Sequence, residues 1–125
     1  MAIDSILDST KKALGIAPDY DVFDPDLIMH INSVFSTLHQ LGIGPDDGFA
    51  IEDADATWDL FLDGDKLLNS IRTYMYLRVK LIFDPPATSF ALSSMKEQVQ
   101  EHEWRLTVYH DGKVWASSTT IIEEP

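Results

Sequence analysis

The sequence predicts an all-α protein: a small helical bundle of three long helices plus a short N-terminal helix, with an extended or hairpin C-terminal tail. Apolar residues recur at spacings of three and four along three stretches of the 125-residue chain. Glycine and proline separate these stretches, as expected where helices end. The hydrophobic fraction of 45 % and the length are sufficient for one core without disulfides or metals.

The short N-terminal helix is expected over residues 4–14. Asp4 or Ser5 can accept hydrogen bonds from the first turn. Lys11 and Lys12 fall in the last turn, where positive charge is favourable, and a glycine follows at position 15. Residues 16–23 are expected to be a linker.

The first long helix is expected over residues 24–42. Asp24 is a capping residue type, and Pro25 has the backbone angle of a first helical position. Glycines and a proline over 42–45 end the pattern. The residues of its broad apolar face are Leu27, Ile28, Ile31, Val34, Phe35, Leu38 and Leu41.

Residues 46–56 form an acidic loop with at most a very short strand near 49–51. A helical turn over 57–62 carries Trp58, which we expect in the core beside Phe61.

The second long helix is expected over 66–83, with Asp65 as a possible cap. Asp84-Pro85-Pro86 ends it, because prolines lack a donor and clash with a helix interior.

The last long helix is expected over 88–107. Two series of residues at intervals of seven predict a seam that packs on the other long helices. Trp104 lies off this seam, so it is either a core residue or a contact between subunits. The two series are Leu92, Val99 and Leu106, and Met95, His102 and Tyr109.

Residues 1–110 and 111–125 are expected to form a helical domain and a C-terminal docking tail. The tail's apolar points are separated by Ser and Thr without a helical period, which is typical of a segment that orders on binding a partner. Alternatively, a hairpin about Asp111-Gly112 folds back on the bundle. The apolar points are Val114, Trp115, Ile121 and Ile122.

The residue pattern does not predict an enzyme, a metal site or a cofactor. The chain has no cysteine, and its four histidines lack metal-ligand spacing. The acidic stretch from Asp53 fails as a calcium loop, because Trp58 stands where glycine is required and Gly64 where a bidentate glutamate is required. There is no nucleophile elbow or phosphate loop, no signal-peptide pattern and no apolar run long enough for a membrane span.

Charge is distributed unevenly along the chain. The net charge is −12, and residues 13–65 hold twelve Asp or Glu but no Lys or Arg. Such a surface should repel DNA, since nucleic-acid binding depends on cations that neutralise phosphates. The acids serve either solubility alone or a useful repulsion of DNA. Arg72, Arg78 and Lys80 cluster on the second long helix. These cations either meet a neighbouring subunit's acidic segment or pair within the chain.

Residues 4–107 resemble the small head–tail connector (adaptor, head-completion) proteins of long-tailed phages and prophages. Residues 108–125 are not part of the pattern. The motifs that carry the resemblance, in order, are the helix start Asp24-Pro25-Asp26, the stop Gly42-x-Gly44-Pro45, the break Phe83-Asp84-Pro85-Pro86 and the run Glu103-Trp104-Arg105-Leu106.

The resemblance implies a structural virion protein at the head–tail interface, made in the cytoplasm of the bacterial host. It implies a dodecameric ring below the portal protein that meets a stopper or tail-completion protein and extends the DNA exit channel. DNA would pass without specific binding. The alternative is an acidic helical regulator or adaptor binding module. The candidate interface residues are Arg72, Arg78, Lys80, Trp104, Val114, Trp115, Ile121 and Ile122.

Overall fold

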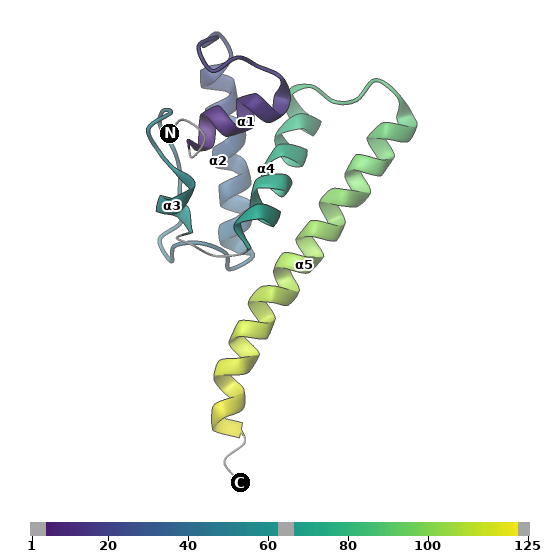
Figure 1. Cartoon of the computed structure of the whole chain (residues 1–125). Coiled ribbons are helices and arrows are strands. Elements are labelled where there is room, and N and C mark those ends of the chain that lie inside the picture. Colours follow the sequence, from purple (N-terminus) through teal and green to yellow (C-terminus); the bar gives the residue numbers. More distant parts are fainter. Residues whose placement is uncertain (1–4, 63–66, 123–125) are drawn as a thin grey trace.

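The computed structural model describes residues 5–62 and 67–122, with side chains up to residue 110. Over these ranges the secondary structure is helical, which confirms the predicted all-α class and the small bundle (Figure 1). The elements in chain order are α1 (Ile6–Leu14), α2 (Asp24–Gln40), α3 (Trp58–Phe61), α4 (Leu68–Phe83) and α5 (Ser89–Ile122).

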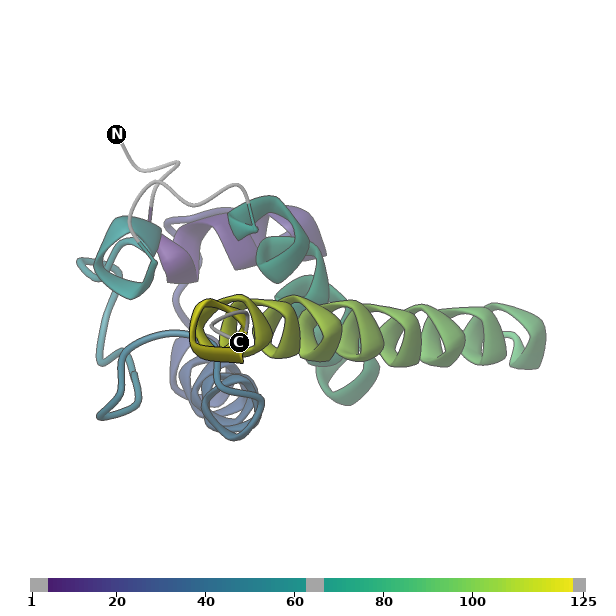
Figure 2. The same cartoon turned by 90° about the horizontal axis from the view of Figure 1, so that it is seen from below.

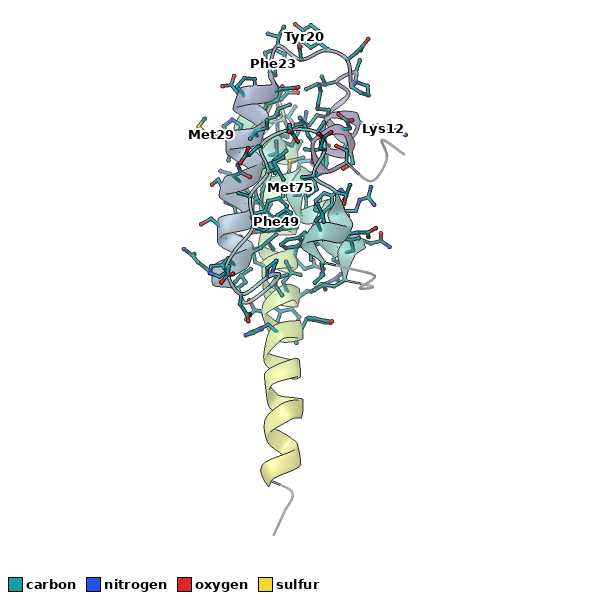
Figure 3. The ribbon with its side chains drawn as sticks, turned by 90° about the vertical axis from the view of Figure 1, so that its left-hand side faces the viewer. Lys12, Tyr20, Phe23, Met29, Phe49 and Met75 are labelled. Atoms are coloured by element: carbon teal, nitrogen blue, oxygen red, sulfur yellow. The ribbon has the colours of Figure 1, made fainter. Side chains whose placement is uncertain are left out.

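Helix α4 is the centre of the bundle, because it contacts α1, α2 and α5. Seen from below, α1 and α2 lie on opposite sides of α5 in projection (Figure 2). Tyr74, Met75 and Val79 of α4 are completely buried between these helices. Helix α5 continues past the lower end of the other helices as a projecting rod (Figures 1 and 3).

The ends of α1 are those that the sequence predicts. The Ser5 hydroxyl oxygen accepts a hydrogen bond from the Asp8 backbone N–H at 3.2 Å. Gly15 adopts φ +83°, a left-handed conformation that suits glycine, and its N–H donates to carbonyls of the last turn. The other possible cap, Asp4, lies outside the described residues.

The predicted capping role of Asp24 is wrong. Helix α2 begins at Asp24 itself, with Phe23 in the capping position and Pro25 in the first turn. The Asp24 carboxylate is directed to Lys11 of α1, 2.8 Å away, rather than to its own helix end. Phe23 closes this end of the bundle through an edge contact with Phe83 of α4, with ring centroids 5.1 Å apart.

An aromatic cluster holds the acidic loop and α3 against α2. Phe35 contacts the rings of Phe49, Trp58 and Phe61 at centroid distances of 5.0, 6.1 and 4.7 Å. Trp58 is 2 % exposed, which confirms the prediction that it belongs to the core. Within the described residues the loop forms a single bridge, between Ser5 and Thr57, and no strand at 49–51.

The second long helix starts at Leu68, two residues later than expected, and ends at Phe83 before the two prolines. Asp65, the expected cap, lies outside the described residues.

The predicted extended or hairpin tail is wrong, and so is the helix end near 107. Helix α5 runs for 34 residues, from Ser89 to Ile122, through Asp111-Gly112. No proline occurs between Pro86 and Pro125 to stop it. A helix makes its hydrogen bonds locally and tolerates one glycine at about 1 kcal/mol, whereas an isolated two-stranded hairpin is marginal in water.

The predicted seam of α5 faces the bundle. Val99 is 8 % exposed and Leu106 is completely buried, while Met95 and Tyr109 pack against the core from its edge. Farther along α5, a β-carbon at Gly42 would lie 2.4 Å from the His110 ring. Glycine at position 42 therefore allows α5 to approach the end of α2.

Candidate functional site

The basic cluster predicted on α4 is divided among separate partners within the subunit. Lys80 pairs with Asp84 one turn later, at 2.9 Å. Arg78 reaches Glu103 of α5, with Nη1 3.4 Å from Oε2. The Arg72 guanidinium lies over the Trp58 ring, 5.7 Å from its centroid. The structure thus brings each cation to a group of its own chain.

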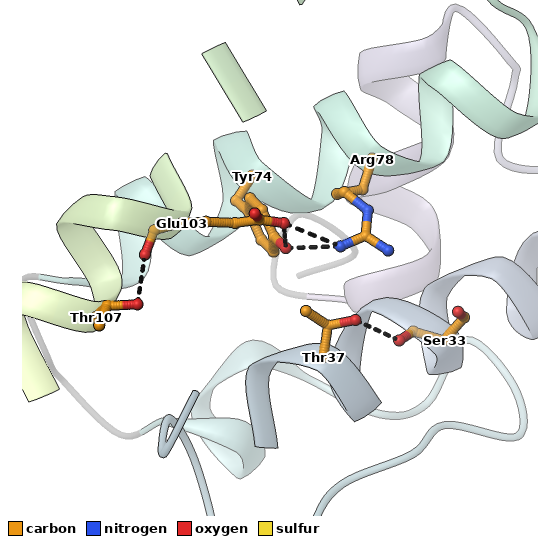
Figure 4. Close-up of polar contacts among 6 residues, drawn as sticks. All are labelled: Ser33, Thr37, Tyr74, Arg78, Glu103 and Thr107. Atoms are coloured by element: carbon orange, nitrogen blue, oxygen red, sulfur yellow. Dashed lines mark hydrogen bonds and ion pairs between the residues drawn. The ribbon is translucent and has the colours of Figure 1, made fainter. Parts of the chain in front are cut away.

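Arg78 belongs to a polar network that fastens α5 to α4 (Figure 4). The Tyr74 hydroxyl donates to Glu103 Oε2 at 2.7 Å and accepts from Arg78 Nη1 at 2.7 Å. Burial raises the pKa of Tyr74, and the hydrogen bond to Glu103 raises it further. The neutral hydroxyl that the network needs is therefore the form that the fold favours.

The tryptophan predicted as either core or subunit contact is on the surface. Trp104 is 66 % exposed, and Val108, one turn later on the same face of α5, is 47 % exposed. Phe90, near the start of the helix, is 85 % exposed. Helix α5 therefore carries apolar side chains away from the seam that packs on α4. The side chains of Val114, Trp115, Ile121 and Ile122 lie outside the described residues.

A buried ion pair, which the sequence analysis missed, joins α1 to the start of α2. The Lys11 side chain is fully buried, and its Nζ donates to the Pro18 carbonyl at 2.9 Å while it pairs with Asp24. Lys11 thereby fixes the 15–23 linker across the end of α1. Helical spacing places Lys11 four residues after Leu7 and three before Leu14, on the apolar face of α1, whereas Lys12 lies off that face. The sequence gives no local signal that Asp24 is the partner of Lys11.

A groove of about 970 Å³ opens beside this linker, between α1 and α4. Lys12 and Arg72 lie along it, and Asp8 is the carboxylate among its lining residues. Figure 3 shows Lys12 on the outer side of α1, away from the core around Met75. Sequence reasoning identified Arg72 but missed Lys12 as its neighbour, because their proximity depends on the packing of α1 on α4.

In the described part of the chain, no three His, Asp or Glu side chains gather into a possible metal site. In the acidic loop, Asp53 Oδ1 accepts a hydrogen bond from the Asp55 N–H at 2.9 Å, which is a local turn. None of the described helices is both long and apolar enough to cross a membrane. The described residues offer three surfaces as candidate contact regions: the groove, the exposed face of α5 and the acidic loops.

A family model described as phage connector protein matches residues 6–113. The search of curated proteins and the search of solved structures each gave no significant match.

Proposed function

Because the chain belongs to the phage connector protein family, we propose that it assembles into a homo-oligomeric ring, dodecameric in the virion, below the portal protein. The far side of the ring binds a stopper or tail-completion protein. The observation that carries this proposal is the family match over residues 6–113, since connector proteins are structural components of the phage particle. The chain is thus a virion component that interacts with other head or tail proteins.

The shape of the subunit supports contacts at two distinct ends. At one end, the linker exposes Tyr20 and Val22, and the first turn of α5 exposes Phe90. At the other end, α5 extends past the bundle (Figure 1). The twelve residues after His110 add about 18 Å of helix at 1.5 Å per residue. Two separated contact regions are what a protein inserted between two partners requires.

The distribution of acids supports a DNA channel without specific binding. Nine of the ten acids described between residues 13 and 62 are exposed, and the tenth, Asp24, pairs with Lys11. Carboxylates on a channel wall repel the phosphate backbone, so DNA slides past without being held. This role requires no catalytic group and no cofactor.

Residues 111–125 are proposed to dock onto the portal or a neighbouring subunit. Because the backbone is helical to Ile122, the docking element is a helix laid in a groove rather than a tail that becomes ordered. Truncation after Asp111 should leave the melting temperature nearly unchanged but abolish loading onto portals. Normal loading of the stable truncated protein would refute this docking role.

The ring itself is tested by mixing the purified protein with assembled portals and imaging by negative-stain electron microscopy. The expected result is an additional ring stacked coaxially on one end of each portal. The matched control is the Phe35→Asp variant, whose core should not form. An absence of association by the folded protein would refute the proposed function.

A further inference from the structure

The groove between α1 and α4 has an apolar floor of small side chains. The floor continues past Ser9 and Ala13 into a smaller hollow of about 280 Å³ beside Trp58 and Tyr76. The residues that form the floor are Ala13, Gly15, Ile16, Ala17 and Pro18. Such a surface accepts an apolar side chain from a partner.

The rim of the groove is basic in an otherwise acidic protein. Lys12 is exposed on one side, and Arg72 lies on the other, stacked over Trp58. The charged lining residues are thus Lys12, Arg72 and Asp8, and the exposed Lys12 lies on a chain of net charge −12. The partner that fits this rim is an acidic segment with an apolar anchor.

The chain carries such a segment on α3 and the loop before it. Leu60 is 65 % exposed, and Asp59 beside it is exposed as well. Exposed Glu52, Asp53 and Asp55 precede them in the loop. This acidic segment, residues 52–60, therefore has the chemistry that the groove requires.

The acidic segment cannot occupy the groove of its own subunit. Trp58 and Phe61 face the core, at 2 % and 4 % exposed, and place Asp59 and Leu60 on the outer side of α3. The Trp58 indole N–H donates to the Ser9 hydroxyl at 2.8 Å and holds α3 in that orientation. If the acidic segment fills such a groove, that groove therefore belongs to another copy of the chain.

We propose that the groove of one subunit receives the acidic segment of the next, with Leu60 on the apolar floor and its carboxylates facing Lys12 and Arg72. Two different surfaces of one chain then meet, which is the heterologous contact that generates a ring. Leu60 and the floor supply most of the affinity, while the charges orient the encounter, because exposed ion pairs contribute little. This inference rests on the proposed ring.

The natural absence of cysteine allows a direct test by disulfide cross-linking. One variant, Ala17→Cys, labels the groove, and a second, Asp59→Cys, labels the acidic segment while leaving the Leu60 anchor in place; both positions are exposed. The two proteins are mixed, loaded onto portals, oxidised and analysed on a non-reducing gel. A disulfide forms only where the two Cα atoms approach within about 7 Å. The matched control replaces Ala17→Cys with Lys96→Cys, an exposed position on α5.

The expected result is a disulfide-linked dimer in the Ala17→Cys and Asp59→Cys mixture, at least tenfold more abundant than in the control mixture or in either variant alone. Adding Lys12→Glu to the groove variant should lower the yield about tenfold, while Lys96→Glu should not. Thermal midpoints of all variants confirm that they are folded.

Equal cross-linking in the test and control mixtures, with portals fully loaded, would overturn the groove contact and leave the ring intact. If the cysteine-free wild-type protein fails to load onto portals, the proposed function falls and this inference falls with it.

Discussion

The tyrosine hydroxyl that links α4 to α5 gives a sharp test of how α5 is held on the bundle. Tyr74→Phe removes one oxygen from a side chain that is completely buried. That oxygen makes two hydrogen bonds of 2.7 Å, one to Glu103 and one to Arg78. Phenylalanine keeps the ring and its packing, so the variant isolates the polar contribution.

At neutral pH we expect Tyr74→Phe to lower the free energy of unfolding by about 1–1.5 kcal/mol. Hydrogen bonds to charged groups contribute about 1.5–3 kcal/mol where both groups are buried. Here the Glu103 and Arg78 side chains are 36 % and 22 % exposed, so water replaces part of what is lost. The expected value therefore lies at or below the low end of that range.

The effect should diminish and then reverse in alkaline solution. The pKa of Tyr74 is raised in the folded protein by burial and then by Glu103, whereas in the unfolded chain it is about 10. Above pH 10 the unfolded tyrosine ionises and the folded one does not, so the stabilisation present below pH 10 is lost as the pH rises toward the folded pKa. Ionisation of Tyr74 in the unfolded chain therefore lowers the free energy of unfolding of the wild type by about 1.4 kcal/mol at pH 11.

Urea denaturation followed by circular dichroism at pH 7 measures the contribution of the hydrogen bonds, and the same experiment at pH 11 measures its loss on ionisation. Other groups also titrate, but they titrate in the wild type and the variant alike, so the difference between the two proteins isolates Tyr74. Tyr20→Phe, at a ring that is 48 % exposed, is the matched control. If the wild type exceeds Tyr74→Phe in unfolding free energy by the same amount at pH 11 as at pH 7, the Tyr74 hydroxyl is not shielded from ionisation by the fold.

Three further substitutions test the fold by urea denaturation. Lys11→Met should lower the free energy of unfolding by about 3 kcal/mol, because it leaves Asp24 without its buried partner. The control, Lys12→Met on the exposed side of α1, should lower it by under about 0.5 kcal/mol. Equal effects of the two substitutions would contradict the buried ion pair. Gly42→Ala should lower the free energy of unfolding by at least about 1–2 kcal/mol, since φ is +83° and the new β-carbon meets the His110 ring. An unchanged stability would contradict the close approach of α5 to Gly42. Phe35→Asp should prevent stable folding, because it removes a buried ring that contributes about 3–5 kcal/mol and buries an unpaired charge. An unchanged melting temperature would show that Phe35 is not a core residue.

Local sequence signals predicted the helices well where the controlling residues are adjacent. Ser5 and Gly15 bound α1 because capping depends on a few neighbouring residues. The intervals of seven identified Val99 and Leu106 as the buried side of α5. Local signals fail at Asp24, where a partner on another helix decides the outcome. An acid before Pro25 is a favourable capping residue, but the Asp24 carboxylate pairs with Lys11 of α1 instead.

The length of α5 was missed because Asp111-Gly112 is a strong local turn signal. A turn pair produces a hairpin only when the flanking strands find stabilising contacts, and a helix needs none beyond its own backbone hydrogen bonds. The hairpin prediction was wrong because the sequence pattern alone does not show whether a turn pair or a continuous helix is more stable.

The candidate site was predicted only in part, because its members are distant in the chain. Arg78 and Glu103 are 25 residues apart, so their ion pair could not be read from helix spacing. Lys12 and Arg72 come together only after α1 packs on α4. The sequence identified the segregation of charge, whereas the folded chain determines which cations pair internally and which line the groove.

The most direct test of the connector role is a cryo-electron microscopy map of the neck of the phage particle that encodes this chain. We expect a ring of twelve copies between portal and tail, with the 34-residue helix α5 visible in each subunit and exposed carboxylates on the channel wall. A neck in which this chain is absent, or is present without a ring around the DNA path, would contradict it.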